Sequence, residues 1–320
     1  MKANINLLLL SILVSIELNS AILADTSNQG TYVPSVILTA PWGDRNLFND
    51  KVASEPGKFG FGVDAESLKV GPTAFTIAPN GDIYIADALN HRIQRYSAQG
   101  SFIKTIPNAW GSIQGGFGVD QDGNIYSPDA HTVNPAVYKF DQDGNQVKIY
   151  PIVKDYEMGT DKPSNWSPDY VSCDDSGRVF MQYTKYPAAP FSFQIGTKDV
   201  VFSGAQQKTT FKEAVFGATA NVPNMNKIPH EVGLLGVDKD AVYTIQKDEQ
   251  NPNISIIRKS TYDGRQIGVY SLDWSQVKCD LITSASMNNH AVFDKGNIYN
   301  FCSDKDGIKI IKWSPVGSSK

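Results

Sequence analysis

One segment of the chain, residues 71–106, contains the parts of a complete four-stranded β-sheet, and those parts recur downstream. It reads GPTAFTIAPNGDIYIADALNHRIQRYSAQGSFIKTI. The Asn80-Gly81 pair between two apolar runs indicates a hairpin, because a type I′ turn needs residues with positive φ. Around Gln99-Gly100, apolar and polar residues alternate as in a partly exposed antiparallel sheet. The predicted strands are residues 75–78, 83–86, 92–96 and 102–106.

The first turn of this unit recurs four more times, each time before a β-branched or small apolar residue and an aromatic one. The five copies are Asn80-Gly81-Asp82-Ile83-Tyr84, Asp122-Gly123-Asn124-Ile125-Tyr126, Ser176-Gly177-Arg178-Val179-Phe180, Lys239-Asp240-Ala241-Val242-Tyr243 and Lys295-Gly296-Asn297-Ile298-Tyr299. Successive turns lie 42, 54, 63 and 56 residues apart, a spacing typical of β-propeller blades with loop insertions. The sequence therefore predicts five four-stranded blades.

The last unit needs a strand from elsewhere, because only a short turn and a tail follow Trp313. Residues 35–42, SVILTAPW, form an apolar stretch before the first unit and have no partner of their own. We expect this N-terminal strand to complete the last blade and close the ring, which leaves only short sheet edges. The propeller domain then covers residues 35–317, followed by a tail, 318–320.

In these features the units resemble NHL repeats. The similarity rests on motifs of the first unit: Gly71-Pro72 before the first strand, Asn80-Gly81-Asp82-Ile83-Tyr84 in the hairpin, Ala86-Asp87 after the second strand, and Asn90-His91-Arg92-Ile93 entering the third. The resemblance implies an all-β propeller of four-stranded antiparallel blades. Such propellers commonly have six blades, so a sixth remains possible, and 206–229 is the stretch that could contain it. Because one scaffold of this kind hosts unrelated activities, the resemblance implies no single function.

The N-terminus predicts export. The first 24 residues combine Lys2, an apolar stretch and small residues near Ala24, as in a secretory signal peptide, and 25–34 follow as a polar leader. We expect a periplasmic or secreted protein without a stable membrane anchor, since the apolar stretch is too short to span a bilayer. A retained anchor remains the alternative, because Glu17 is an unusual end to such a stretch.

The charge of the chain argues against a nucleic-acid partner. Its formal net charge is −4, and it has no basic tract that could neutralise phosphates. We expect a monomer that binds a peptide, a protein or a glycan.

Three cysteines in an exported chain allow one disulfide. Cys279 precedes the first strand of the last unit and Cys302 falls at the end of its second strand, so both are expected on one face of the same blade. We predict a Cys279–Cys302 disulfide, worth about 3 kcal/mol by the chain-entropy model.

Function is expected at the face that carries the longer connections. In a propeller, the first and third turns of every blade share one face, while the loops after the second and fourth strands share the other. We call the latter the loop-rich face. Candidate ligand-binding residues there are Asp87, Trp110, Asp129, Trp166 and Glu231. The alternative is structural: the aspartates bind backbone amides of a neighbouring loop, and the tryptophans pack beneath long loops.

A metal-dependent enzyme is the competing interpretation. Peptide-amidating lyases, which are NHL-like propellers, hold a central metal with histidines; by that resemblance His131, His230 and His290 would bind a divalent ion, and His91 would be a residue of the repeat. A lactonase-like site would use Glu231, Asn288 and Asn289, but the Glu-Gly-Pro opening of that family is absent, since Lys69-Val70-Gly71-Pro72 stands in its place. The leading interpretation is a binding module that catalyses nothing, with no predicted cofactor.

Overall fold

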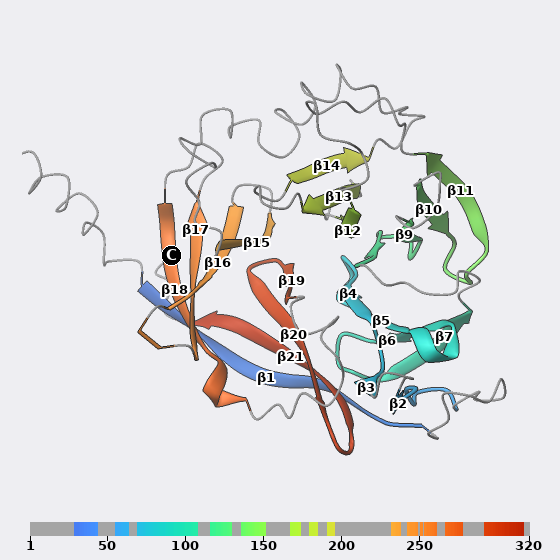
Figure 1. Ribbon diagram of the computed structural model, residues 1–320, viewed down its shortest axis with the longest axis horizontal. Coiled ribbons are helices and arrows are strands. Elements are labelled where there is room, and N and C mark those ends of the chain that lie inside the picture. The colour runs from blue at the N-terminus through green and yellow to red at the C-terminus, as the bar shows by residue number, and fades with distance from the viewer. Residues whose placement is uncertain are drawn as a thin grey trace, which may run out of the picture.

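The structure is a computed structural model, and the residues that it describes are mostly in β-strands. It describes residues 29–43, 55–63, 69–107, 116–129, 136–151, 167–173, 179–184, 191–195, 232–237, 242–248, 250–251, 253–260, 266–277 and 291–316. Within these ranges the only helices are two 3₁₀ turns, η2 (Ala88–Asn90) and η5 (Trp274–Gln276), and no helix is long and apolar enough to cross a membrane. The sheets are arranged around a common centre (Figure 1).

The first unit is a four-stranded antiparallel sheet, as predicted. Its order is β4-β5-β6-β7, so each strand pairs with the next one along the chain. The strands are β4 (Ala74–Ile77), β5 (Ile83–Asp87), β6 (Arg92–Tyr96) and β7 (Phe102–Pro107). Both β4 and β5 are buried along their whole length, whereas β7 lies largely at the surface.

The other units repeat this plan. The second contains β8 (Gly118–Val119), β9 (Ile125–Asp129), β10 (Ala136–Phe140) and β11 (Gln146–Pro151). The third has three strands among the described residues, β12 (Ser167–Cys173), β13 (Val179–Thr184) and β14 (Phe191–Ile195). The fourth contains β15 (Val232–Val237), β16 (Val242–Lys247), β17 (Ile254–Ser260) and β18 (Gln266–Asp273). The fifth contains β19 (Ala291–Asp294), β20 (Asn297–Asp304) and β21 (Gly307–Val316). Strands β2 (Gly62–Val63) and β3 (Lys69–Val70) form a small separate sheet.

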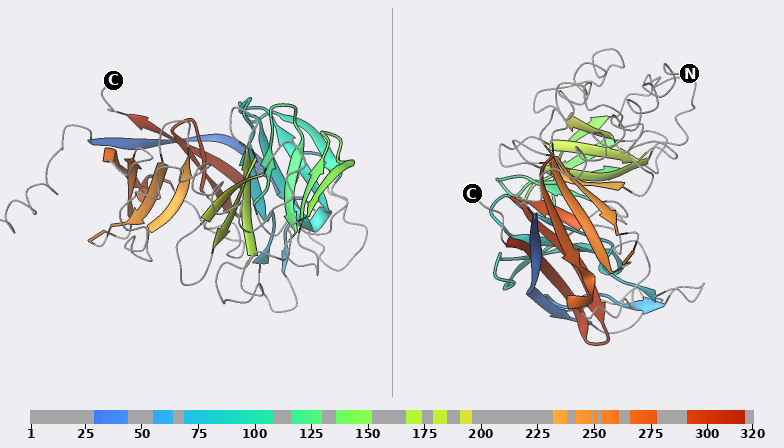
Figure 2. Two further views of the ribbon diagram at one scale, coloured as in Figure 1. Left: turned by 90° about the horizontal axis from the view of Figure 1, so that it is seen from above. Right: turned by 90° about the vertical axis from the view of Figure 1, so that its left-hand side faces the viewer.

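The long strand β1 (Gln29–Pro41) lies beside the fifth unit. It pairs antiparallel with β21 from Thr31 opposite Val316 to Pro41 opposite Gly307, and its first three residues also pair parallel with β18. The fourth and fifth units thereby share one eight-stranded sheet. Figure 2 shows β1 running from the fourth unit to the side of the first. Since β1 begins at Gln29, it includes part of the predicted leader, 25–34.

The end of the fifth unit differs from the prediction. The sequence suggested a turn after Trp313, but β21 continues to Val316. Trp313 is fully buried, and its indole N–H donates to Asn300 Oδ1 at 2.6 Å. Trp313 also pairs with Pro34 of β1, so these contacts keep the backbone extended where the sequence alone resembles a turn.

The first hairpin forms at the predicted position, but the predicted turn type, I′, was wrong. Only Gly81 has positive φ there, at 88°, whereas a type I′ turn needs two such residues. Ala78 N–H donates to Asp82 O, and Gly81 N–H donates to Ala78 O, both at 2.8 Å. This is a three-residue loop that ends on a left-handed glycine, and Gly100, Gly123 and Gly144 close turns of the same form. At Lys295-Gly296, by contrast, both residues have positive φ.

Among the described residues, apolar side chains between neighbouring sheets form three cores. One lies between the fourth and fifth units, one between the fifth unit with β1 and the first unit, and one between the first and second units. The first strands of the units contact one another in the order β15, β19, β4, β8 and β12. The described units therefore follow one another around the centre in the order fourth, fifth, first, second and third.

The repeated aromatic residue of the second strand packs against a cation on the third. Each aromatic residue and its cation occupy directly opposed positions, with the cation 5.2–5.9 Å from the ring centre. The pairs are Tyr84–Arg95, Tyr126–Lys139, Tyr243–Lys259 and Tyr299–Lys312. In the third unit the same positions hold Phe180 and Gln194. The repeat thus includes cross-strand cation–π contacts on the flank of a blade.

Candidate functional site

The segment 55–60, here called the linker, runs between the end of β1 and the first unit. Phe59 N–H donates to Pro41 O at 3.1 Å, and Gly43 N–H donates to Phe59 O at 2.8 Å. The Phe59 ring is fully buried and stacks on Tyr96, with ring centres 6.1 Å apart. The linker is therefore fixed on one side by the backbone of the N-terminal strand region and on the other by the first unit.

The linker begins with a tight turn. Lys58 N–H donates to Glu55 O at 3.1 Å, and Gly57 between them has φ of 82°. Proline at the second position and a left-handed glycine at the third are typical of a type II turn, which the Pro56-Gly57 pair provides. The turn exposes its backbone groups toward β6.

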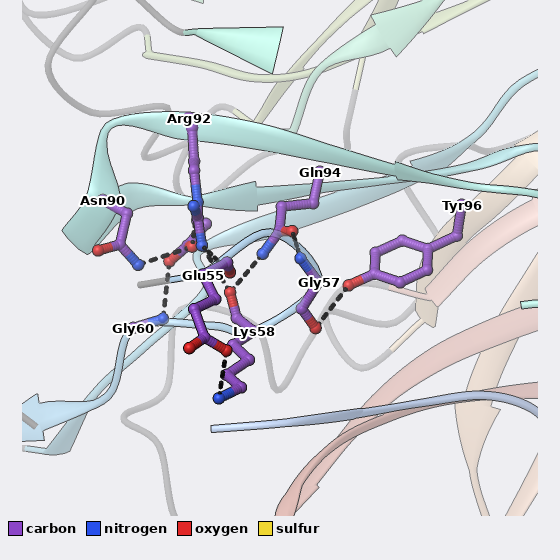
Figure 3. A network of polar contacts seen from close by, with 9 residues as sticks. Glu55, Gly57, Lys58, Gly60, Asn90, Arg92, Gln94 and Tyr96 are labelled. Carbon is purple, nitrogen blue, oxygen red and sulfur yellow. Dashed lines mark hydrogen bonds and ion pairs between the residues drawn. The ribbon is translucent and has the colours of Figure 1, made fainter. Parts of the chain in front are cut away.

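Side chains of β6 bind those backbone groups (Figure 3). Gln94 Nε2 donates to Lys58 O at 2.5 Å, and Gln94 Oε1 accepts from Gly57 N at 2.6 Å. The Tyr96 hydroxyl donates to Gly57 O at 3.2 Å. Arg92 Nη2 donates to Lys58 O at 2.6 Å and to Glu55 O at 3.3 Å. Because alternate residues of a strand share a face, three consecutive residues of that face hold the linker.

Asp87 joins this network from the end of β5. Its fully buried carboxylate accepts from Arg92 Nε at 2.9 Å, from Asn90 Nδ2 at 2.7 Å and from the backbone N–H of Gly60 at 3.0 Å. A side chain on Gly60 would overlap Leu89 and Asn90, so only glycine fits this close approach. We call Asp87, Arg92, Gln94 and Tyr96 with their linker contacts the clasp.

The residues of the clasp lie in a recognisable sequence motif. Residues 70–96 match the family model of the NHL repeat. This stretch of the chain is therefore similar to an NHL repeat. The matched range includes all four side chains of the clasp, so in this protein the positions that match the NHL model attach the preceding linker to the first unit.

Comparisons of whole chains add only distant likenesses. No curated protein matches the sequence. Among solved structures, a streptogramin B lyase is 12% identical, with 89% of this chain and 98% of that chain covered and a TM-score of 0.34. An inactive variant of virginiamycin B lyase from Staphylococcus aureus, with quinupristin, is 13% identical, with 89% and 100% covered and a TM-score of 0.33. Hydrazine synthase from Kuenenia stuttgartiensis is 12% identical with a TM-score of 0.31; 73% of this chain is covered, but only 56% of that chain. These likenesses carry no argument about activity.

The other predicted ligand-binding residues lie mostly outside the described residues. Asp129 ends β9 and pairs with Ala136, as Asp87 ends β5 and pairs with Arg92. Outside the described residues are Trp110, Trp166, Glu231, His131, His230, His290 and Cys279. Among the residues that the structure describes, no group of three or more His, Cys, Asp or Glu side chains has metal-binding geometry.

Cys302 lies in β20 and is fully buried in the core between the fourth and fifth units. Because Cys279 is outside the described residues, the Cys279–Cys302 disulfide stays a prediction.

Sequence reasoning identified Asp87 but missed its partners. It assigned no role to the linker, to Gln94 or to Tyr96. The available signal was Gln94, a polar residue in the middle of a predicted strand. Such a residue must find hydrogen-bond partners when buried.

Burial of Asp87 gives the stability a pH dependence. Loss of solvent raises the pKa of this carboxyl above 3.8, and the hydrogen bond from Asn90, the Arg92 charge and the Gly60 N–H offset only part of that rise. The folded state then holds this proton more tightly than the unfolded chain does. The contribution of Asp87 to the free energy of unfolding therefore falls as the pH rises from below 3.8 to the folded-state pKa, and stays constant above it.

This pH dependence can be measured with Asp87→Asn, which cannot titrate. Urea unfolding of both proteins between about pH 3 and pH 7 gives the difference in free energy of unfolding, natural chain minus variant. We expect that difference to fall with rising pH and then to level off. A difference that rises with pH would show that the pKa of Asp87 is lowered in the folded protein.

His91, the histidine that the resemblance assigned to the repeat, ends η2 in a left-handed conformation. Its φ is 48°, and its backbone N–H donates to Ala88 O at 3.1 Å. Asn tolerates this conformation, whereas a β-branched residue does not. We expect His91→Asn to change the free energy of unfolding by less than about 0.5 kcal/mol and His91→Val to lower it by about 1–2 kcal/mol. Equal losses in urea unfolding would mean that the imidazole itself stabilises the fold.

Proposed function

We propose that this protein is an exported five-bladed NHL-type propeller that binds a peptide, a protein or a glycan with its loop-rich face and catalyses nothing. The proposal makes β1 the outer strand of the fifth blade and the final element of the ring.

Two equivalent contacts support that role of β1. A Cβ atom on Gly144, in the last turn of the second unit, would lie closer than 3.0 Å to Pro107 O of β7, the outer strand of the first unit. A Cβ atom on Gly100, in the corresponding turn of the first unit, would lie closer than 3.0 Å to Ile37 O of β1. Thus β1 contacts the last turn of the first unit in the same way as β7 contacts the last turn of the second. This is the contact expected of an outer strand in the preceding blade.

The binding proposal is carried by the difference between the two kinds of connection. Turns of one face are short and closed by hydrogen bonds, as at Ala78–Asp82, Ser97–Ser101, Asp120–Asn124 and Asp141–Asn145. The loop-rich face also has short connections, such as 305–306 between β20 and β21, but it includes much longer ones: 108–117 between β7 and β8, 152–166 between β11 and β12, and 274–290 between β18 and β19. Long loops at one face of a rigid scaffold are where binding residues usually concentrate.

The binding test uses a glycan array and a phage library of random peptides as probes. For a selected ligand, we expect Trp110→Ala or Trp166→Ala to weaken affinity by at least about tenfold, because buried aromatic contacts dominate such interfaces. Gln99→Ala, an exposed residue of a tight turn on the opposite face, is the matched control and should leave affinity unchanged. Failure to select any ligand, or an equal loss in the control, would contradict the proposal.

Metal analysis addresses the enzyme alternative. We expect the purified full chain to contain less than about 0.1 divalent ion per molecule and to unfold at the same temperature with and without a chelator, since a bound metal would stabilise the folded state. A stoichiometric ion that disappears in both His131→Ala and His230→Ala would instead favour the metal-dependent enzyme. Gln99→Ala serves as the control that should retain the metal content of the natural chain.

A further inference from the structure

Strand β1 and its partner β21 are far apart in the chain. Their ladder joins ten residue pairs, and the Tyr32 hydroxyl donates to Gly296 O across 264 residues of sequence. Between β1 and the linker lies the segment 44–54. Apart from this covalent connection, β1 is held as a separate peptide would be.

The contacts of β1 are those of a strand recognised by its backbone. Besides the ladder, Ser35 Oγ donates to Lys312 O at 3.3 Å, and Trp42 Nε1, just after β1, donates to Asp304 O at 2.8 Å. Like the Tyr32 hydroxyl, both groups donate to main-chain oxygens of the fifth unit. The ladder would hold an extended peptide through its main chain, and these three side chains add donors that are specific to the β1 region.

Specificity comes from the inward side chains of β1. Tyr32, Leu38 and Ala40 are at most 2% exposed and belong to the cores on either side of the fifth unit. Val33 and Val36, in contrast, are 47% and 56% exposed. The site therefore selects apolar side chains at the inward positions and leaves the outward ones free.

The surface of the fifth unit fits this strand closely. A Cβ atom on Gly307 would lie closer than 3.0 Å to Ala40 O, so the glycine permits the approach of the two backbones. Without β1, the outer edge of β21 would present unpaired N–H and C=O groups next to uncovered core residues such as Ile308 and Ile310. An edge of that kind binds another extended strand readily.

We propose that β21 and the adjoining core residues form an acceptor site for an extended peptide, and that β1 of a second copy occupies it whenever the resident β1 is released. In the intact chain the covalent connection through 44–54, here called the tether, keeps the effective concentration of the resident strand at about 1 mM. A competing strand at 1 µM would then fill on the order of 0.1% of the sites. This site is independent of the loop-rich face, so its test does not depend on the ligand proposed there.

The test cuts the tether and leaves every residue in place. A site for a specific protease is introduced into segment 44–54 of the full chain, and the probe is a fluorescent synthetic peptide of residues 29–43. After cleavage, we expect saturable binding of the probe, at least about 100-fold more than to the uncut chain at 1 µM peptide. A peptide with Leu38→Asp should not compete, whereas its matched control, Val36→Asp, should compete like the natural sequence.

The second-copy part of the proposal is tested with the uncut chain. Refolded from urea at about 1 mM, where neighbouring copies match the effective concentration of the tethered strand, it should yield a substantial dimer fraction in size-exclusion chromatography with light scattering. Refolded at about 10 µM, it should be monomeric. The chain cut after refolding should lose the dimer, because nothing then links the two copies.

Several results would overturn the proposal. One is a folded cut protein that fails to bind the probe, and another is equal competition by the Leu38→Asp and Val36→Asp peptides. Absence of dimer at the high concentration would refute exchange between copies. If cutting unfolds the protein, the added 29–43 peptide must restore the circular dichroism of the natural chain, and failure to restore it also refutes the acceptor site.

Discussion

Replacing Asp87 by alanine is expected to lower the free energy of unfolding by about 3–5 kcal/mol, the usual cost of breaking a buried ion pair by removing one partner. The variant leaves the Arg92 guanidinium, whose side chain is 10% exposed, without its counter-ion, and the Gly60 N–H without its acceptor. Urea unfolding at neutral pH measures the loss.

The same network supplies the control for this experiment. Glu55 and Lys58 form an ion pair at 2.6 Å, but their side chains are 73% and 41% exposed. Solvent screens such a pair, so Glu55→Ala should cause no measurable change. If both variants lost equal stability, burial of the Asp87–Arg92 pair would not be what makes the clasp important.

A double variant separates the ion pair from the other contacts of the clasp. Once Asp87 is absent, removing Arg92 eliminates an unpaired buried charge, although Lys58 O loses a donor. We expect Asp87→Ala with Arg92→Ala to lose less than the sum of the two single variants, by at least about 1 kcal/mol. Additive losses would indicate that the two side chains act separately.

Gly144→Ala is expected to be the other strongly destabilising substitution, at about 2–5 kcal/mol. Left-handed backbone costs a non-glycine residue about 1–2 kcal/mol, and forcing an atom into a packed site adds typically 1–3 kcal/mol. Gly144 combines both, since its φ is 89° and an added Cβ would overlap Pro107 O of the neighbouring sheet. The second contribution comes from backbone, which cannot move aside as a flexible side chain would.

Gly123 provides a matched control in the same sheet. Its φ is 79°, but the nearest atoms to an added Cβ are side-chain atoms of Gln142 and Tyr84 at 3.5 Å, an ordinary contact. Gly123→Ala should therefore lose only the backbone share, about 1–2 kcal/mol. Equal losses in urea unfolding would mean that the second unit is not packed on β7 as closely as described.

Features of the fold that depend on a few neighbouring residues were predictable from the sequence, whereas features that depend on distant contacts were not. Strands of the first unit could be found to within one residue because turn glycines and alternation act over a few residues. The turn at Gly81 was assigned the wrong type, since Asn-Gly is compatible with both the two-residue and the three-residue loop. Nothing near Trp313 in sequence shows that Pro34 lies beside it, so the full length of β21 depended on a distant partner.

The candidate site shows the same division. Asp87 could be singled out because it follows the second predicted strand of its unit. The sequence left open whether it binds a ligand or a backbone amide. The structure gives it the Gly60 N–H as a partner. Gln94 and Tyr96 could not be assigned because their partners are main-chain atoms of the linker, and backbone groups carry no sequence signature.

The pairing of β1 with β21 also means that the first of these strands is synthesised well before its partner. Translation at 5–20 residues per second needs roughly 13–50 s to cover the 264 residues between Tyr32 and Gly296, which are hydrogen-bonded in the folded protein. Throughout that interval a thirteen-residue strand has left the ribosome without the partner that buries Leu38. Until synthesis reaches the fifth unit, the apolar side chains that β1 buries in the folded protein lack the surface that covers them, and such exposure favours aggregation.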